Sequence, residues 1–290
     1  MLKDTRFPAK ITINCQGRLL SLHEPVVMGI LNVTPDSFYA GSRLLEAGGL
    51  QTDALLDRAG DMLRDGASIL DLGAYSTRPG AAEISEQEEI DRLVPAIEAI
   101  RKAFPDAFLS ADTFRAKVAR AAVQAGANLI NDVGGGTLDA DMFETVADLQ
   151  APYILMHMRG TPADMQQHTQ YDNLLADIAA FLLSRAHTLH QLGVKDVIFD
   201  PGFGFAKTID QNFELLRRLG ELVGLDYPVL AGISRKSMIY RTLGTDAAGA
   251  LNGTTFLHAF ALSAGARILR VHDVKPAAEA IQLYSKLGSV

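Results

Sequence analysis

The sequence predicts an α/β chain folded as a closed (β/α)8 barrel, the TIM-barrel architecture, from three observations. Eight short apolar segments alternate with amphipathic helical stretches along the chain. Each segment is almost continuously apolar, which is typical of parallel strands buried on both faces. Nearly every segment ends in polar side chains, and in this architecture the carboxyl ends of all strands meet at one functional rim. The alternative is an open doubly wound sheet, which the missing GxGxxG motif after the first strand disfavours.

Composition and charge narrow the class of protein. The chain of 290 residues is 48% hydrophobic and 21% charged, and this apolar content is enough to fill one large core. We therefore expect a single domain, with a hairpin extension over residues 1–24 and a barrel over residues 25–290. The net charge of −7 offers no basic surface for nucleic acid or a membrane, although a few clustered cations suffice for an anionic substrate. One cysteine, Cys15, excludes an internal disulfide and a four-cysteine zinc site. Without a signal peptide, the expected location is cytoplasmic.

The elements follow in a regular order. Residues 11–22, ITINCQGRLLSL, alternate around a Gln-Gly turn and predict a short β-hairpin. The helical pattern is clearest over residues 52–67 and 85–104, and residues 247–266 predict an uncharged helix that packs inside the fold or against a second subunit. The predicted barrel strands lie at residues 26–33, 68–73, 108–113, 128–133, 153–158, 197–202, 229–234 and 267–272.

Functional groups gather where these strands end. The predicted rim carries Asn32, Asp36, Asp71, Thr77, Arg78, Asp112, Thr113, Asn131, Asp132, His157, Arg159, Asp200, Ser234, Lys236, Arg270, His272 and Asp273. Three strand-end carboxylates alternating with amides favour a ligand site over simple loop caps. By itself, His157 is more typical of a packing residue than of a catalyst. It and His168 lack metal-ligand spacing, so we expect no transition metal held by the protein.

The rim groups sort into two chemical sets. Arg78, Lys236, Arg270 and His272 are cations, or become cations on protonation, and suit a phosphate or diphosphate. Asp112, Asn131 and Asp200 suit the edge of a heterocycle, because carboxylates accept hydrogen bonds from an exocyclic amine and a ring N–H. A flat ring beside a leaving diphosphate indicates substitution at an activated carbon.

Several motifs resemble those of the dihydropteroate synthases, in order from about Pro25 to the end of the chain. They are NVTPDSF (32–38), STRPG (76–80), SADT (110–113), NDVGGG (131–136), MHMRGTPADMQ (156–166), DPGFGF (200–205), SRKS (234–237) and RVHDV (270–274). The resemblance implies a transferase of folate biosynthesis. In that reaction 4-aminobenzoate attacks (7,8-dihydropterin-6-yl)methyl diphosphate and releases diphosphate.

The resemblance also implies roles for individual residues. Those similar to the pterin-holding residues are Asp112, Asn131, Asp200 and Lys236, and Asn32 is similar to the position that ligates Mg²⁺, which binds the diphosphate. Those similar to the residues that bind diphosphate or guard the rim are Thr77, Arg78, Arg270 and His272. The implied catalytic set is Asp36, Arg78, Lys236, Arg270 and His272.

A pocket and an assembly are implied in the same way. Phe205 and Ser237 are similar to residues of the aminobenzoate pocket, which loops bearing Pro35 and Phe38 complete. Asp36 would reach the reaction zone when its loop closes. The family usually forms homodimers, so we expect one here.

The chain departs from the family pattern at two places. Ala74-Tyr75 replace a common Gly-Glu pair, which leaves the geometry of the second loop open. Ala206 replaces a frequent Gly and should only stiffen its turn. Two other functions stay open: a methyltetrahydrofolate-dependent methyltransferase module, which has no use for STRPG or SRKS, and a pterin- or phosphate-binding barrel without catalysis.

Overall fold

The computed structural model describes residues 12–33, 45–46, 49–50, 52–75 and 83–287. Within them, eight parallel strands form one sheet in the order β10-β9-β8-β7-β6-β3-β12-β11. The strands are β3 (Val26–Asn32), β6 (Ala67–Gly73), β7 (Phe108–Asp112), β8 (Leu129–Asp132), β9 (Tyr153–Met156), β10 (Val197–Asp200), β11 (Leu230–Ala231) and β12 (Ile268–Val271). Each one falls in a segment that the sequence predicts as a barrel strand, except that β6 begins one residue earlier, at Ala67.

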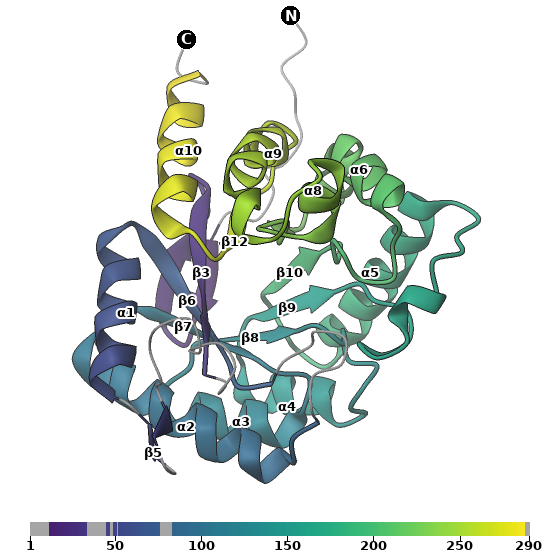
Figure 1. Cartoon of the computed structure of the whole chain (residues 1–290). Helices are drawn as coiled ribbons and strands as arrows, with labels where there is room; N and C mark the ends of the chain where they lie inside the picture. The colour runs from purple at the N-terminus through teal and green to yellow at the C-terminus, as the bar shows by residue number, and fades with distance from the viewer. Residues whose placement is uncertain (1–11, 34–44, 47–48, 51, 76–82, 288–290) are drawn as a thin grey trace, which may run out of the picture.

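The sheet closes between its two end strands. A parallel bridge joins Phe199 of β10 to Val229, the residue before β11, and the Phe199 N–H donates to the Pro228 carbonyl at 2.8 Å. The helices surround the strands (Figure 1). The predicted (β/α)8 barrel is therefore confirmed, and the open doubly wound sheet is excluded.

Helices follow the strands as the alternation predicts. They are α1 (Thr52–Arg64), α2 (Glu86–Ala103), α3 (Ala116–Gln124), α4 (Met142–Leu149), α5 (Leu174–Gln191), α6 (Ile209–Arg217), α7 (Leu219–Val223), α8 (Ser237–Thr242), α9 (Leu251–Ser263) and α10 (Val274–Leu287). Two short strands, β4 (Leu45–Glu46) and β5 (Gly49–Leu50), pair after β3. Among the described helices, none combines the length and the apolar character needed to span a membrane.

Local sequence sets the helix starts. The Ser85 side chain accepts the Glu88 N–H at 3.1 Å and so caps α2. At α6, Thr208 and Gln211 form a reciprocal capping box. Such caps satisfy N–H groups that lack a partner in the first turn, which fixes where each helix begins relative to the preceding strand end.

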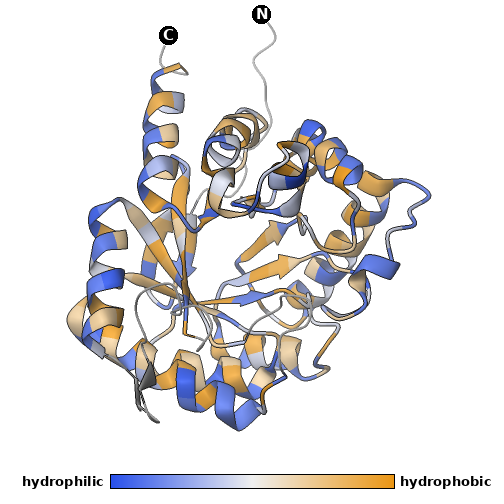
Figure 2. Ribbon diagram, viewed as in Figure 1, coloured by the Kyte–Doolittle hydropathy of each residue, from blue (hydrophilic) through white to orange (hydrophobic). Residues whose placement is uncertain are grey.

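The core has two apolar layers. One lies between the strands and the surrounding helices and includes Leu70, Leu109 and Leu155. The other fills the barrel at the amino-terminal ends of the strands. Figure 2 shows apolar residues concentrated on the strands and on the helix faces turned toward them. This is the distribution expected for a parallel sheet that is buried on both faces.

The short β-hairpin that the sequence predicts is present, and it closes the amino-terminal end of the barrel. It comprises β1 (Thr12–Cys15) and β2 (Arg18–Ser21), and Gln16 and Gly17 both have positive φ, as a tight hairpin turn requires. Ile13, Cys15, Leu20 and Leu22 pack into the same cluster as one inward residue from each of seven barrel strands. Those residues are Met28, Ile69, Leu129, Ile154, Ile198, Leu230 and Ile268. The chemistry is thereby left to the opposite end.

This packing predicts a contrast between two leucines of the hairpin segment. Leu22 is fully buried, whereas Leu19 is 70% exposed. Leu22→Ala should lower the free energy of unfolding by about 2–5 kcal/mol, because it leaves a cavity under the barrel. Leu19→Ala should change it by no more than about 0.5 kcal/mol. Urea unfolding measures both, and equal effects would contradict the closing role of the hairpin.

Candidate active site

Strand register places three predicted residues at one level. Asn32 pairs with Gly73, Gly73 with Asp112, and Asp112 with Asn131, across β3, β6, β7 and β8. A Cβ at Gly73 would lie 3.3 Å from the Cβ of Asp112, so the glycine leaves room for that carboxylate. The amide, the carboxylate and the second amide therefore share one end of the barrel.

An ion-pair network inside the barrel includes two residues of this row, Asp112 and Asn131. Arg270 of β12 donates from Nε to Asp71 Oδ2 at 2.6 Å and from its terminal nitrogen to Asp112 Oδ2. The Asn131 amide donates to the same Asp71 oxygen at 3.0 Å. Burial lowers the pKa of Arg270, but Asp71 and Asp112 outweigh it and hold that pKa above its usual value. Four strands are thereby joined through one guanidinium and two carboxylates.

Burial tunes the acidity of Asp112. Loss of hydration raises the pKa of Asp112 to about 7, and Arg270 opposes this rise while Asp71 adds to it. Arg270 occupies only one of the two carboxylate oxygens. The other oxygen is the acceptor that a ligand with ring donors would use.

A second carboxylate lies at the end of β10, next to a lysine. Asp200 is 5% exposed and accepts the Gly202 N–H at 2.8 Å. Burial raises the pKa of Asp200, and Lys236 works against that rise. A Cβ at Gly232 would lie 3.8 Å from both Asp200 Oδ2 and Lys236 Nζ. These two side chains therefore flank the same glycine at the barrel mouth.

Lys236 begins the turn into α8 and faces an aromatic ring. Its Nζ donates to the Phe203 carbonyl and lies 4.7 Å from the centroid of the Phe205 ring. Burial lowers the pKa of Lys236 to about 8, although Asp200 opposes this. Ser237, the first residue of α8, follows directly. A cation, a ring and a hydroxyl residue are thus grouped at the carboxyl ends of β10 and β11.

The ends of β11 and β12 carry a hydroxyl and an imidazole. Ser234 Oγ is 3.1 Å from His272 Nδ1 and accepts the His272 N–H at 3.2 Å. His272 is half-buried and lies two residues beyond Arg270. Alternation along the strand turns both side chains to the barrel interior.

An apolar patch borders the polar groups. Phe205 packs with a cluster at the carboxyl ends of the strands that consists of Phe114, Val133, Leu138, Met156, Met158, Met165 and Ala206. Methionines adapt their shape to flat ligands and contact aromatic rings favourably. The mouth therefore combines an apolar surface with carboxylate, amide and ammonium groups, which suits a planar, polar-edged ring.

Most predicted site residues lie at this end of the barrel. They are Asn32, Asp112, Asn131, Asp200, Phe205, Lys236, Ser237, Arg270 and His272. Pro35, Asp36, Phe38, Thr77 and Arg78 lie outside the described residues. The two chemical sets predicted from sequence interlock, because Arg270 of the cationic set is bound to Asp112 of the ring set.

Two buried residues, Asp71 and Lys207, take part in the site although the sequence assigns no binding or catalytic role to either. Asp71 binds Arg270 and Asn131 and is fully buried, and a carboxylate inside the apolar run SILDLG already required a charged partner. Lys207 is 3% exposed and donates to the Gly202 and Phe205 carbonyls. The sequence contains no comparable indication for it, because a lysine after a strand is usually exposed.

Other polar residues of the rim have structural partners. Asp132 accepts the N–H groups of Gly134 and Gly136, both at 2.7 Å, and so shapes the glycine-rich loop. Arg235 binds both carboxylate oxygens of Asp273, at 2.6 and 2.9 Å. These residues hold the loops that frame the site.

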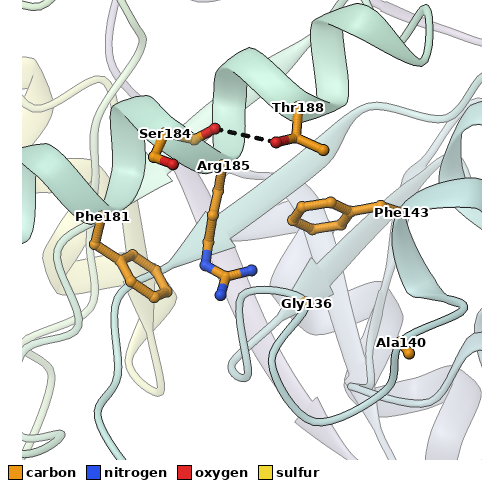
Figure 3. Close-up of a pocket in the computed structure, with 7 residues that line it drawn as sticks. All are labelled: Gly136, Ala140, Phe143, Phe181, Ser184, Arg185 and Thr188. Atoms are coloured by element: carbon orange, nitrogen blue, oxygen red, sulfur yellow. Dashed lines mark hydrogen bonds between the residues drawn. The ribbon is translucent and has the colours of Figure 1, made fainter.

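A separate cavity of about 420 Å³ lies between α4, α5 and the glycine-rich loop (Figure 3). Its lining residues are Gly136, Ala140, Phe143, Phe181, Ser184, Arg185 and Thr188. The Arg185 guanidinium is 4.6 Å from the centroid of the Phe181 ring. No strand-end residue of the candidate site lines this cavity, so it is distinct from the barrel mouth.

The buried ion pair predicts a stability difference between two aspartates. Asp71→Asn should lower the free energy of unfolding by about 3–5 kcal/mol, because Arg270 stays buried with one carboxylate fewer. Asp61→Asn should cost about 1 kcal/mol or less, since its pair with Arg64 is solvent-exposed. Chemical denaturation of both variants measures this. A small loss for Asp71→Asn would contradict the stabilising role of the network.

The chain is similar in sequence to known proteins that bind pterins. The family described as pterin binding enzyme matches residues 28–272. The chain is 40% identical to dihydropteroate synthase of Haemophilus influenzae over 92% of this chain and 96% of that one. It is 39% identical to the Escherichia coli enzyme over 92% and 93% of the two chains.

Solved structures agree with the sequence relatives. The dihydropteroate synthase of Yersinia pestis in a sulfonamide drug complex has a TM-score of 0.90 at 40% identity, covering 96% of this chain and 100% of that one. The Thermus thermophilus enzyme in complex with 4-aminobenzoate has a TM-score of 0.84 at 39% identity, covering 95% and 99%. By sequence and by structure, the chain belongs to the dihydropteroate synthase family of pterin-binding barrels.

Proposed function

We propose that this chain is a dihydropteroate synthase, a transferase of folate biosynthesis. It condenses 4-aminobenzoate with (7,8-dihydropterin-6-yl)methyl diphosphate and forms 7,8-dihydropteroate and diphosphate. The observation that carries the proposal is the array of Asp112, Asn131, Asp200 and Lys236 at one barrel end, where Asn131 and Asp200 are buried and Asp112 and Lys236 are half-buried. The names of the related enzymes and their complex with 4-aminobenzoate support it.

The array suits the polar edge of a pterin. The ring presents an exocyclic amine and ring N–H donors, for which Asp112 and Asp200 are the acceptors. Asn131 is held by Asp71 through its amide nitrogen, so its amide oxygen remains available as an acceptor. Lys236 donates to the ring acceptors. Buried partners of this kind discriminate strongly, because a ligand that lacks a donor leaves a carboxylate unpaired.

The departing diphosphate requires compensation of growing negative charge. Thr77, Arg78, Arg270 and His272 are proposed to supply it at the rim, with Lys236 between the ring and the reacting carbon. Electrostatic groups that are already in place stabilise a leaving anion without reorganisation. The ion pairs of Arg270 with Asp71 and Asp112 hold its guanidinium in place.

Asn32 is the residue proposed to hold Mg²⁺. In the part of the chain that the structure describes, no cluster of three or more His, Cys, Asp or Glu could hold a metal ion. Mg²⁺ is usually bound by one or two protein oxygens together with substrate phosphates and water. The half-buried Asn32 amide at the end of β3 is such an oxygen donor. When bound, Mg²⁺ would neutralise charge on the diphosphate.

The second substrate is assigned to the apolar side of the mouth. Phe205 and Ser237 are proposed to contact 4-aminobenzoate, and Pro35 and Phe38, which lie outside the described residues, are proposed to complete the pocket. Asp36 is proposed to approach the reacting atoms with its loop. The same pocket would take sulfonamides, in line with the named complex of the Yersinia pestis relative.

Positioning and electrostatics dominate the proposed mechanism. An arylamine is already a neutral nucleophile, so a strong base is not required. Alignment of two reactants supplies roughly 7–11 kcal/mol of a barrier, whereas a general base contributes about 10²–10⁴-fold, or roughly 3–5 kcal/mol. The buried, preorganised side chains at the barrel mouth match the first contribution.

Diphosphate release tests the function. The chain mixed with both substrates and Mg²⁺ should release diphosphate, and a chelator should suppress the release. Asp112→Asn should abolish pterin binding measured by calorimetry, because its NH2 group would face either the Arg270 donor or the ring donors and leave that donor unpaired, while Asp106→Asn serves as an exposed control. No release by the intact chain would overturn the proposal and leave the methyltransferase or the non-catalytic binding protein.

We also propose a cytoplasmic homodimer that associates through α9 and α10. Phe256 and Phe260 of α9 are 62% and 53% exposed, with ring centroids 5.0 Å apart. Leu283 and Leu287 of the neighbouring α10 are 70% and 79% exposed. Large exposed apolar side chains on two helices that pack together are typical of a protein interface. Gly253 meanwhile packs α9 against Ile239 of α8, because a Cβ there would lie 2.6 Å from it.

The proposed interface predicts that one introduced charge dissociates the dimer. Phe256→Glu should convert the dimer to a monomer, because it buries an unpaired carboxylate at the interface. Leu183→Glu, on the 40% exposed side chain of α5, should leave the assembly unchanged. Sedimentation velocity measures both. A monomeric wild-type chain, or a dimeric Phe256→Glu variant, would contradict this interface.

A further inference from the structure

The loop after β10 is held by side-chain donors along its whole backbone. Five consecutive carbonyl oxygens, from residue 202 to residue 206, each accept a hydrogen bond from a side chain. In order, the donors are Lys207, Lys236, Gln166, Lys207 and Tyr171. Lys207 is the only one of them used twice, at 2.9 Å to Gly202 and at 3.0 Å to Phe205.

Lys207 has a third partner from another strand end. Its Nζ lies 3.1 Å from Nδ1 of His157, which follows β9 and is 1% exposed. Burial lowers the pKa of His157 to about 2, so the imidazole is neutral. When Lys207 is charged its ammonium group only donates, so Nδ1 then accepts and the ring proton is on Nε2. The three bonds use all three ammonium protons.

This arrangement is unusual for a lysine. Lys207 is 3% exposed, and burial lowers its pKa to about 7, with Asp200 opposing the shift and Lys236 and Arg159 adding to it. Burial of a lysine ammonium group lowers the stability of the fold unless hydrogen bonds replace its hydration. The bonds of Lys207 do so, and they fix the conformation of the loop. Here that conformation includes Gly202, whose φ is +71° and whose absent Cβ leaves room for the His157 carbonyl.

The loop so fixed carries two groups of the aminobenzoate side of the mouth. Phe205 packs in the apolar patch and lies beside the Lys236 ammonium group. Lys236 in turn donates to the Phe203 carbonyl of the same loop. The Lys207 bonds at Gly202 and Phe205 bracket that carbonyl. A change at Lys207 is therefore transmitted to the Phe205 ring and to the Lys236 ammonium group.

We propose that Lys207 is a positioning residue for the arylamine substrate: without touching it, the buried ammonium sets the loop that presents Phe205 and Lys236. The inference rests on the proposed function. Of the groups assigned to the pterin, Asp112 and Asn131 lie on β7 and β8, away from this loop. Asp200 and Lys236 touch the loop backbone only at Gly202 and Phe203, whereas Phe205 belongs to the loop. A change at Lys207 should therefore affect the arylamine more strongly than the pterin.

The test is the kinetics of Lys207→Met, a side chain of similar length without donors. We expect KM for 4-aminobenzoate to rise at least about tenfold, because two loop carbonyls lose their partner. The dissociation constant for the pterin diphosphate, measured by calorimetry, should change by less than about threefold. Lys275→Met, on an exposed lysine of α10, should match the wild-type chain in both measurements.

His157→Ala is the second variant, and it tests the positioning role of Lys207 if Lys207→Met does not fold. It removes one acceptor and leaves both carbonyl bonds, so it should raise the same KM by a smaller factor at unchanged pterin affinity. Unchanged KM in a folded variant, or equal loss of both affinities, would overturn the inference. Absence of turnover in the wild-type chain would instead overturn the proposed function, so the two failures are distinguishable.

Discussion

The site depends on one guanidinium inside the barrel. Arg270 is bound by Asp71 and Asp112, and Asn131 joins the same oxygen of Asp71. A buried charge is tolerated only with close, hydrogen-bonded partners, so each member of this group constrains the others. Because the members come from β6, β7, β8 and β12, the network sets how these strand ends face one another. An intact network therefore presents Asp112 and Asn131 to a ligand in a fixed arrangement.

The barrel interior changes from apolar to polar along its axis. On β3 the inward residues run from Met28 to Asn32, and on β12 they run from Ile268 through Arg270 to His272. The hairpin covers the apolar end, where Leu22 packs beneath the strands. Such a division places the apolar packing at one end and the ligand-facing groups at the other, while the Arg270 network at the polar end contributes to stability as well.

Backbone conformation at the mouth is held by side chains more than by regular structure. Ala206 has φ of +50° and Arg235 has φ of +53°, both in the left-handed region. Non-glycine residues adopt it at a cost, which surrounding contacts must offset. For Arg235 these are the bonds to Asp273. For Ala206, where sequence reasoning expects only a stiffer turn, Lys207 and Tyr171 hold the loop.

The sequence by itself determined the barrel, its eight strands, the hairpin and the residues at the strand ends, because strands buried on both faces are continuous apolar runs that alternate with amphipathic helices. It also assigned the chemical type of the rim through Asp112, Asn131, Asp200 and Lys236. Only the tertiary structure decided which charges pair, since the partner of Arg270 lies 199 positions away at Asp71. It alone decided that Lys207 is buried, because a side chain's burial depends on packing by distant segments such as the one that bears His157.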